Sequence, residues 1–186
     1  LNKSKSLLLP YLVLFICLHL AFILILEPNF GKQTHEVDLA LGVKTFFNML
    51  GPLVNPSSPQ NLMLGTFNLE IARLYNYILQ DEKSQYGIIH GLDGYDEISL
   101  TSGFKLFTKS GEQLINPEDN GLERISQSEI YGGNSVKDAA KIFKNIIEGK
   151  GTKAQNSVVL TNAAYALIII DRNLTFEEAY NTAEGS

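Results

Sequence analysis

The distribution of apolar and polar residues divides the chain into two unlike parts. From Leu7 to Leu26, 18 of 20 residues are apolar and none is charged. As a helix rising about 1.5 Å per residue, this run would reach about 30 Å, the thickness of the hydrocarbon core of a membrane. Hydropathy therefore favours a membrane anchor over a buried helix or a sequence that never had to fold. Membrane contact is expected only through residues 7–26.

After about Val37 the pattern becomes that of an α/β domain. Apolar runs bounded by turn residues are typical of short strands, and glycine beside serine is typical of a tight turn. Strands are predicted at 62–67, 86–89, 98–101 and 104–108, with a turn at Ser102-Gly103 between the last two.

Four helices are predicted between and after these strands. Asn68 is a suitable cap for the first and Ser135 for the second, since both side chains accept hydrogen bonds from free helix amides. Residues 158–170 are almost all apolar, which is typical of a helix buried on all sides. Thr175 and Glu178 form a capping box for the last helix.

Prolines mark one connection in the chain as stiff and irregular. Pro52, Pro56 and Pro59 fall within residues 51–59 and lack the amide donors that a helix needs. We interpret residues 51–59 as a hinge or connector. It precedes the first predicted strand of the α/β domain.

Length and charge exclude several classes of protein. The 186 residues carry 15 Lys and Arg against 20 Asp and Glu, a net charge of −5, and this acidic balance argues against nucleic-acid binding. One Cys excludes an internal disulfide framework, and with three His in all it argues against structural zinc. The chain is long enough for one domain or a part of a larger one.

The loop from His90 to Glu97 is the strongest candidate for chemistry. It follows an apolar strand, where open α/β sheets place their ligands, and it holds two glycines and three carboxylates. A hard cation such as Mg²⁺, which takes carboxylate and phosphate oxygens, would explain that clustering. The alternative is a solvated acidic turn, since Asp and Gly are ordinary turn residues, and for an isolated loop that alternative is favoured.

Two other features have a functional and a structural interpretation. Gly132-Gly133-Asn134-Ser135 before a helix could bind phosphate on free amides, but a glycine turn with a helix cap is the simpler interpretation. His90 could act as an acid or base, but a lone His at a strand end is more often structural. The sequence shows no Ser/His/Asp or Cys/His set for covalent catalysis.

Several separate motifs, in order, resemble the anthranilate phosphoribosyltransferase family. The resemblance runs from about Ala40 to Glu184, roughly four-fifths of the chain. It comprises Leu41 to Pro56, His90-Gly91-x-Asp93-Gly94-x-Asp96-Glu97, Pro117-Glu118-Asp119, Gly132-Gly133-Asn134-Ser135 and Asn162-Ala163-Ala164. The resemblance implies a fold of the α/β class: the large domain of a phosphoribosyltransferase similar to class II nucleoside phosphorylases, with a mixed sheet flanked by helices.

The resemblance also implies an activity and its site. The family transfers phosphoribose from phosphoribosyl pyrophosphate (PRPP) to the amine of anthranilate, in the biosynthesis of tryptophan, and its members are usually cytoplasmic homodimers. Asp96 and Glu97 match the acidic pair that binds the Mg²⁺ cofactor, and Gly51 matches a hinge glycine at the anthranilate pocket. No residue of the chain is assigned as a catalytic nucleophile or base.

The chain also departs from the family pattern. It contains no Gly-Thr-Gly-Gly-Asp sequence, the loop that holds PRPP in the family, and Asp38 stands where the family has an arginine for the anthranilate carboxylate. We therefore expect the chain alone to be inactive, and residues 1–36 to be an anomalous segment, membrane-like or frame-shifted, before a partial glycosyltransferase domain at 37–186. The alternatives are a degenerate fragment without activity, a membrane-tethered α/β binding module and, less favoured, a nucleoside phosphorylase relative.

Overall fold

A computed structural model describes Leu53 and residues 59–186. Several sequence predictions lie outside these residues and stay predictions. They concern the Leu7–Leu26 run, Asp38, Gly51 and most of the hinge at 51–59. The structural statements below apply to the described part of the chain.

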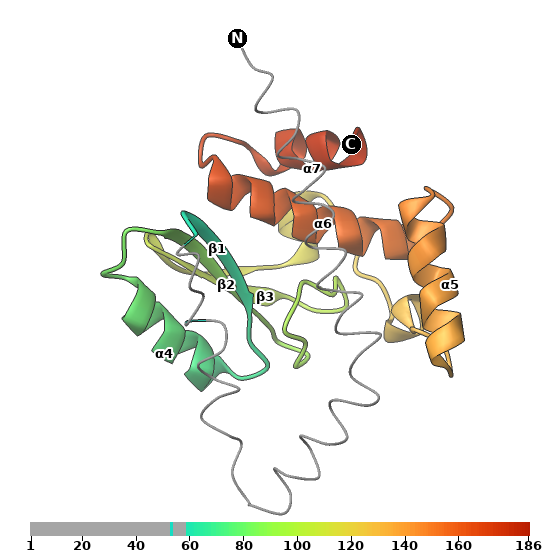
Figure 1. Cartoon of the computed structure of the whole chain (residues 1–186), viewed down its shortest axis with the longest axis horizontal. Coiled ribbons are helices and arrows are strands. Elements are labelled where there is room, and N and C mark those ends of the chain that lie inside the picture. The colour runs from blue at the N-terminus through green and yellow to red at the C-terminus, as the bar shows by residue number, and fades with distance from the viewer. Residues whose placement is uncertain (1–52, 54–58) are drawn as a thin grey trace, which may run out of the picture.

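The centre of the described domain is a mixed four-stranded sheet (Figure 1). Its strands follow the order β1 (Asn61–Gly65), β2 (Gln85–Gly91), β3 (Phe104–Thr108) and β4 (Gly111–Ile115). β1 and β2 are parallel, whereas β2–β3 and β3–β4 are antiparallel. The mixed sheet flanked by helices confirms the predicted fold class.

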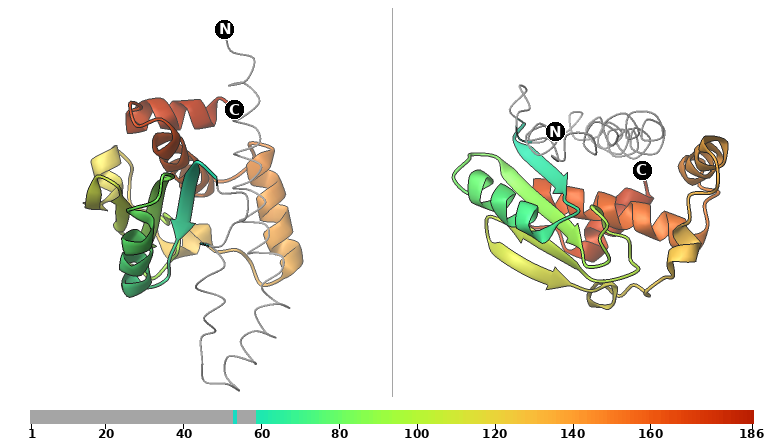
Figure 2. Two further views of the ribbon diagram at one scale, coloured as in Figure 1. Left: turned by 60° about the vertical axis from the view of Figure 1, so that its left-hand side comes forward. Right: turned by 90° about the horizontal axis from the view of Figure 1, so that it is seen from below.

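Helices cover both faces of this sheet. The four α-helices are α4 (Leu69–Leu79), α5 (Val136–Ile147), α6 (Lys153–Ile170) and α7 (Phe176–Glu184), and two short 3₁₀ helices are η2 (Pro117–Asn120) and η3 (Gln127–Ile130). α4 connects β1 to β2 and packs on β2 and β3, and α6 packs on β1, β2 and α7. Figure 2 shows α5 to one side of the sheet.

The alternation of side chains along β2 creates one apolar core on each face of the sheet. Tyr86 and Ile88 pack with Phe107 and with α4, whereas Ile89 packs on the other face with Leu106 and Tyr165. Successive strand residues point to opposite faces, so a strand covered on both sides must be apolar throughout. The buried run at 86–89 therefore reads as a continuous apolar stretch and not as an alternating one.

The helix starts predicted at Asn68, Ser135 and Thr175 are confirmed, whereas the helix predicted from residue 158 begins earlier, at Lys153, where Thr152 and Gln155 form a capping box that was not predicted. The Asn68 side chain accepts a hydrogen bond from the Glu70 amide, and Ser135 accepts one from the Asp138 amide. Thr175 and Glu178 form the expected reciprocal capping box. Each cap satisfies amides that have no partner within the helix, which fixes where these helices begin.

Two strand assignments differ from the sequence predictions. The strand predicted at 98–101 does not form: Leu100 has φ 62°, a left-handed value that interrupts extended backbone, and Ser99 and Thr101 hydrogen-bond to Asp93. β4 was not predicted, because it is an edge strand whose residues are mostly polar and exposed. Edge strands need no apolar face, so periodicity does not reveal them.

Helices α5 and α6 differ in how far their side chains are buried. No residue of α6 from Ala154 to Ile170 is exposed, as predicted for an apolar helix at 158–170. α5 has no fully buried residue, and Val136 and Ile147 at its two ends are about half exposed. Within the described residues, the apolar side chains of α5 are therefore only partly covered.

Candidate functional site

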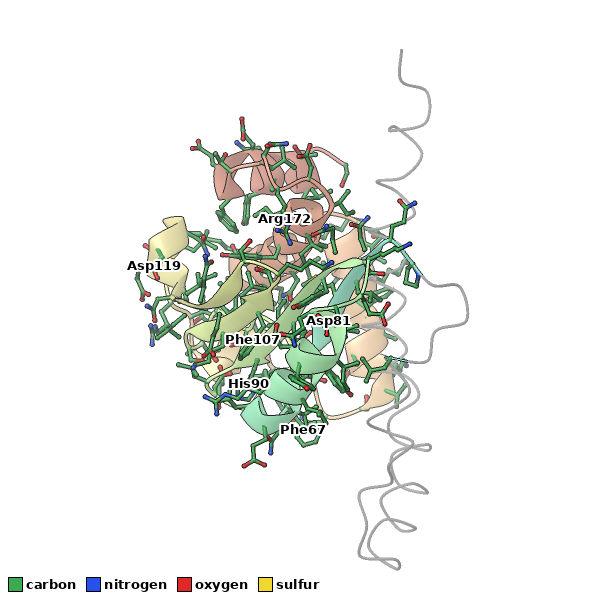
Figure 3. The ribbon with its side chains drawn as sticks, turned by 90° about the vertical axis from the view of Figure 1, so that its left-hand side faces the viewer. Phe67, Asp81, His90, Phe107, Asp119 and Arg172 are labelled. Carbon is green, nitrogen blue, oxygen red and sulfur yellow. The ribbon has the colours of Figure 1, made fainter. Side chains whose placement is uncertain are left out.

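The candidate site lies at the carboxyl end of the buried strand β2. Figure 3 shows His90 and Phe67 at the same end of the sheet, with Arg172 toward the opposite end. The His90 ring nitrogen Nδ1 lies 2.8 Å from the Thr66 carbonyl oxygen, which can only accept, so Nδ1 carries the proton. His90 thus ties the end of β2 to the segment after β1. This contact favours the structural interpretation of His90.

The loop after β2 folds back on itself through glycine. The Gly91 amide donates to the Tyr95 carbonyl at 2.9 Å, and the Gly94 amide donates to the Gly91 carbonyl at 3.0 Å. Gly94 has φ 93°, which only glycine adopts readily. This turn brings residues 95–97 back toward the end of the sheet.

The carboxylate of Asp93 is used inside the loop. Its Oδ2 accepts hydrogen bonds from the hydroxyls of Ser99, at 2.7 Å, and Thr101. Burial raises the pKa of Asp93, but the hydrogen bonds from Thr101 and Ser99 outweigh it and hold the pKa below its usual value. Asp93 is therefore a structural anion that fastens the loop to the segment at 99–101. The sequence analysis grouped Asp93 with Asp96 and Glu97. Ser99 and Thr101, a few residues later in the sequence, are the signal that could have indicated its structural role.

Asp96 and Glu97 lie where the loop returns to the sheet. Asp96 is exposed, and its main chain passes so close to β1 that a Cβ on Gly65 would lie 1.8 Å from the Asp96 carbonyl oxygen. Glu97 is partly buried, and burial together with the neighbouring charge of Asp96 raises its pKa to about 7. The structure therefore places the two predicted carboxylates side by side on a segment held against β1. The importance of Gly65 was not predicted.

A further polar residue reaches this segment from α6, which covers the face of the sheet on which Ile98 is buried. Asn162, in the middle of α6, hydrogen-bonds with both the amide and the carbonyl of Ile98, the residue after Glu97. Sequence reasoning assigned no role to Asn162. Its signal was the one amide side chain within the apolar run at 158–170, in the Asn162-Ala163-Ala164 motif of the family resemblance.

The donor set at Asp96 and Glu97 suits Mg²⁺ better than a softer metal. None of the ion pairs between residues 59 and 186 involves either carboxylate, so no described cation offsets their charge. The same residues contain no group of three or more His, Cys, Asp and Glu side chains around a common point, so water or substrate oxygens would have to complete the coordination of a metal at Asp96 and Glu97. Mg²⁺ commonly binds one or two carboxylates together with substrate phosphates and water. The described residues fit that pattern.

The remaining sequence candidates show structural roles or lie outside the described residues. Gly133 has φ 90° in the turn before α5, and Ser135 caps that helix, which supports the turn-and-cap interpretation. In the Pro117-Glu118-Asp119 motif, Asp119 accepts the Asn116 amide at 2.7 Å. Gly51, predicted at a substrate pocket, is not among the described residues.

Comparison with protein families gives one match over most of the chain. Residues 21–186 match the family model described as "Glycosyl transferase family, a/b domain". The match begins inside the apolar run, ahead of Val37. The proposed boundary between residues 36 and 37 stays a prediction.

Curated relatives of the chain are named anthranilate phosphoribosyltransferase. One from Flavobacterium johnsoniae is 52% identical over 141 residues, covering 76% of this chain and 43% of the relative. One from Flavobacterium psychrophilum is 47% identical over 155 residues, covering 83% and 47%. The chain thus spans less than half the length of these relatives.

Solved structures give the same result for the fold. Anthranilate phosphoribosyltransferase from Saccharomyces cerevisiae, in complex with PRPP and Mg, superposes with a TM-score of 0.71 and 25% identity over 82% of this chain and 44% of that one. The enzyme from Thermus thermophilus has a TM-score of 0.70 at 25% identity, over 80% and 44%. Among residues 59–186, none of the helices combines the length and hydrophobicity that a membrane-spanning segment requires.

Proposed function

We propose that this chain, which belongs to the glycosyl transferase family whose model matches residues 21–186, supplies the magnesium-binding part of an anthranilate phosphoribosyltransferase, an enzyme that transfers phosphoribose from PRPP to anthranilate. The observation that carries the proposal is the pairing of Asp96 and Glu97 on a braced segment at the end of β2, without a described cation beside them. A relative at 25% identity was solved with PRPP and Mg. That supports PRPP and Mg²⁺ as ligands here.

The chemistry requires little covalent participation from the protein. The amine nitrogen of anthranilate forms a bond to ribose C1, the bond from C1 to the pyrophosphate oxygen breaks, and the amine loses one proton. Bound Mg²⁺ neutralises charge on the pyrophosphate group. Asp96 and Glu97 would hold that ion, and their positions would orient the leaving group relative to C1. No residue is assigned as a nucleophile.

Gly65 and Asp93 each help to hold the loop that carries Asp96 and Glu97 in place. Gly65 leaves the space into which the Asp96 main chain fits, and Asp93 closes the loop through Ser99 and Thr101. Both groups act on the position of the acidic pair and contact no reacting atom. We propose that the loop is held in one geometry before substrate arrives, which limits the entropy lost on binding.

Other parts of the family site are proposed from the sequence alone. Gly51 is proposed to border the anthranilate pocket, and a homodimer is the proposed assembly. The 186 residues contain no Gly-Thr-Gly-Gly-Asp sequence, and Asp38 is proposed to stand at the position where the family has an arginine. We therefore propose that this chain alone does not bind both substrates productively.

Metal binding by the 186-residue chain tests the proposal. Mn²⁺, a paramagnetic substitute for Mg²⁺, is titrated into the chain, and free Mn²⁺ is measured by electron paramagnetic resonance with Mg²⁺ as competitor. We expect one site in the wild type, lost in the double variant Asp96→Asn, Glu97→Gln and kept in Glu123→Gln, whose side chain is 88% exposed. Equal binding by the double variant and the wild type would reject Asp96 and Glu97 as the metal ligands.

A further inference from the structure

Asn162 is a buried amide in the middle of an apolar helix. Its side chain is only 6% exposed, and it stands between Thr161 and Ala163, which are also buried. A buried amide is unfavourable unless its donors and acceptor are hydrogen-bonded. The partners of this side chain therefore indicate why an amide stands at this position.

All partners of Asn162 are backbone groups, and two of them belong to one residue. Its Oδ1 accepts the Ile98 amide at 3.1 Å, and its Nδ2 donates to the Ile98 carbonyl at 2.8 Å. Nδ2 also donates to the Val158 carbonyl at 2.9 Å, one turn earlier in α6. The two carbonyls can only accept, so the orientation of the amide is determined by its partners.

This double contact replaces a neighbouring strand. The segment from Ile98 to Thr101 is buried or nearly so, yet it forms no strand, because Leu100 has φ 62°. Its backbone groups need partners that a sheet would otherwise provide. Asn162 offers one acceptor and one donor to the same residue, as a paired strand residue does.

We infer that Asn162 is a positioning residue that fixes the Asp96–Glu97 pair through the backbone of Ile98. Ile98 is completely buried and directly follows Glu97, so its backbone determines where the Glu97 main chain lies. On the other side of the pair, the Asp96 carbonyl is packed against Gly65. The acidic pair is thus anchored at both ends, and these anchors oppose the repulsion between its two carboxylates. This inference rests on the proposed function only where it concerns the metal.

Two variants of Asn162 separate its contacts. Asn162→Asp keeps an acceptor for the Ile98 amide but places an oxygen against the Ile98 carbonyl. Asn162→Leu has similar volume and removes every hydrogen bond. Thr161→Val is the matched control, since Thr161 is also buried in α6 and its hydroxyl bonds only to the Ser157 carbonyl of the same helix. Circular dichroism and urea unfolding of the 186-residue chain show which variants are folded.

Hydrogen exchange measures the positioning without reference to metal. In both Asn162 variants we expect amide exchange in residues 92–101 to accelerate at least about tenfold, with no change in β2 and the rest of α6. Mn²⁺ affinity should fall about 10- to 100-fold, the usual effect of removing a residue that orients metal ligands. Thr161→Val should leave loop exchange and Mn²⁺ affinity unchanged.

The outcomes distinguish this inference from the proposed metal site. If folded Asn162→Asp shows wild-type exchange at 92–101, Asn162 does not position the loop and the inference is overturned. The same conclusion follows if exchange accelerates but Mn²⁺ affinity is unchanged, because the pair would then be positioned by other contacts. Should the wild type bind no Mn²⁺ while the variants still accelerate loop exchange, the metal site is wrong and the structural role of Asn162 stands.

Discussion

The raised pKa of Glu97 predicts that this carboxylate destabilises the metal-free fold at alkaline pH. Burial and the charge of Asp96 raise its pKa from 4.5 to about 7. At about 1.4 kcal/mol for each pKa unit, this corresponds to about 3 kcal/mol. The folded chain binds the Glu97 proton more tightly than the unfolded chain, so the contribution of Glu97 to stability is most favourable below pH 4.5 and is lost as the pH rises from 4.5 through about 7.

The perturbation that exposes this effect is Glu97→Gln, which removes the charge and keeps the size of the side chain. Relative to the wild type, the variant should be more stable by about 3 kcal/mol at pH 8 and by only about 1 kcal/mol at pH 5. Urea unfolding in EDTA, followed by circular dichroism at both pH values, measures the difference. Glu123→Gln makes the same change of net charge at an 88% exposed side chain and should follow the wild-type curve.

Two results would refute this reasoning. If Glu97→Gln gives the same difference from the wild type at pH 5 and pH 8, the Glu97 carboxylate is hydrated or already paired in the folded chain. If Glu123→Gln shows the same gain at pH 8, the effect comes from net charge and not from the site. Adding Mg²⁺ at pH 8 should stabilise the wild type and not Glu97→Gln, since binding to the folded state alone raises stability.

Three further perturbations test separate parts of the structure. Gly65→Ala places a Cβ 1.8 Å from the Asp96 carbonyl oxygen and should lower Mn²⁺ affinity at least tenfold, as measured by electron paramagnetic resonance; unchanged affinity would show that the close approach is unimportant. Gly87→Ala, where a Cβ would lie 2.3 Å from Ile169 Cδ1, should cost about 1–3 kcal/mol in urea unfolding, restored in part by adding Ile169→Val, and should not change Mn²⁺ affinity. Removal of residues 1–36 should reduce aggregation, measured by light scattering, and partition into detergent, measured by phase separation, because 18 of the 20 residues at 7–26 are apolar. If the full and shortened chains aggregate and partition equally, residues 1–36 are not a foreign apolar segment.

The elements with strong local signals could be predicted from the sequence. The buried strand at 86–89, the caps at Asn68 and Thr175, and the apolar helix at 158–170 each follow from short-range rules. The strand predicted at 98–101 was wrong because its apolar residues are buried by tertiary contacts, with the backbone satisfied by the Asn162 side chain 64 residues away. The amide at position 162 is visible in the sequence, but its pairing with Ile98 is not. β4 was missed for the opposite reason, since an exposed edge strand has no apolar pattern.

In the candidate site, too, local sequence features could be predicted and contacts between distant segments could not. Asp96 and Glu97 were selected through the family resemblance, because the residue pattern alone favoured a solvated acidic turn, and their role as metal ligands stays a prediction. The contributions of Gly65 and Asn162 depend on close approach and backbone contacts between distant segments, so they required coordinates. Asp93 was predicted as part of the acidic cluster. Its hydrogen bonds from the Ser99 and Thr101 hydroxyls show instead that it holds the loop together.

Asp96 and Glu97 are proposed to hold the metal of an anthranilate phosphoribosyltransferase. A test of this role uses a protein in which residues 37–186 are joined to the preceding part of the Flavobacterium johnsoniae relative. Its turnover is followed by the loss of anthranilate fluorescence with PRPP across a magnesium titration. We predict magnesium-dependent turnover by the joined protein, none by the 186-residue chain alone, and a loss of at least about 100-fold in the double variant Asp96→Asn, Glu97→Gln, with Glu123→Gln unaffected. Turnover by the double variant equal to that of the joined wild type at every magnesium concentration would contradict the account.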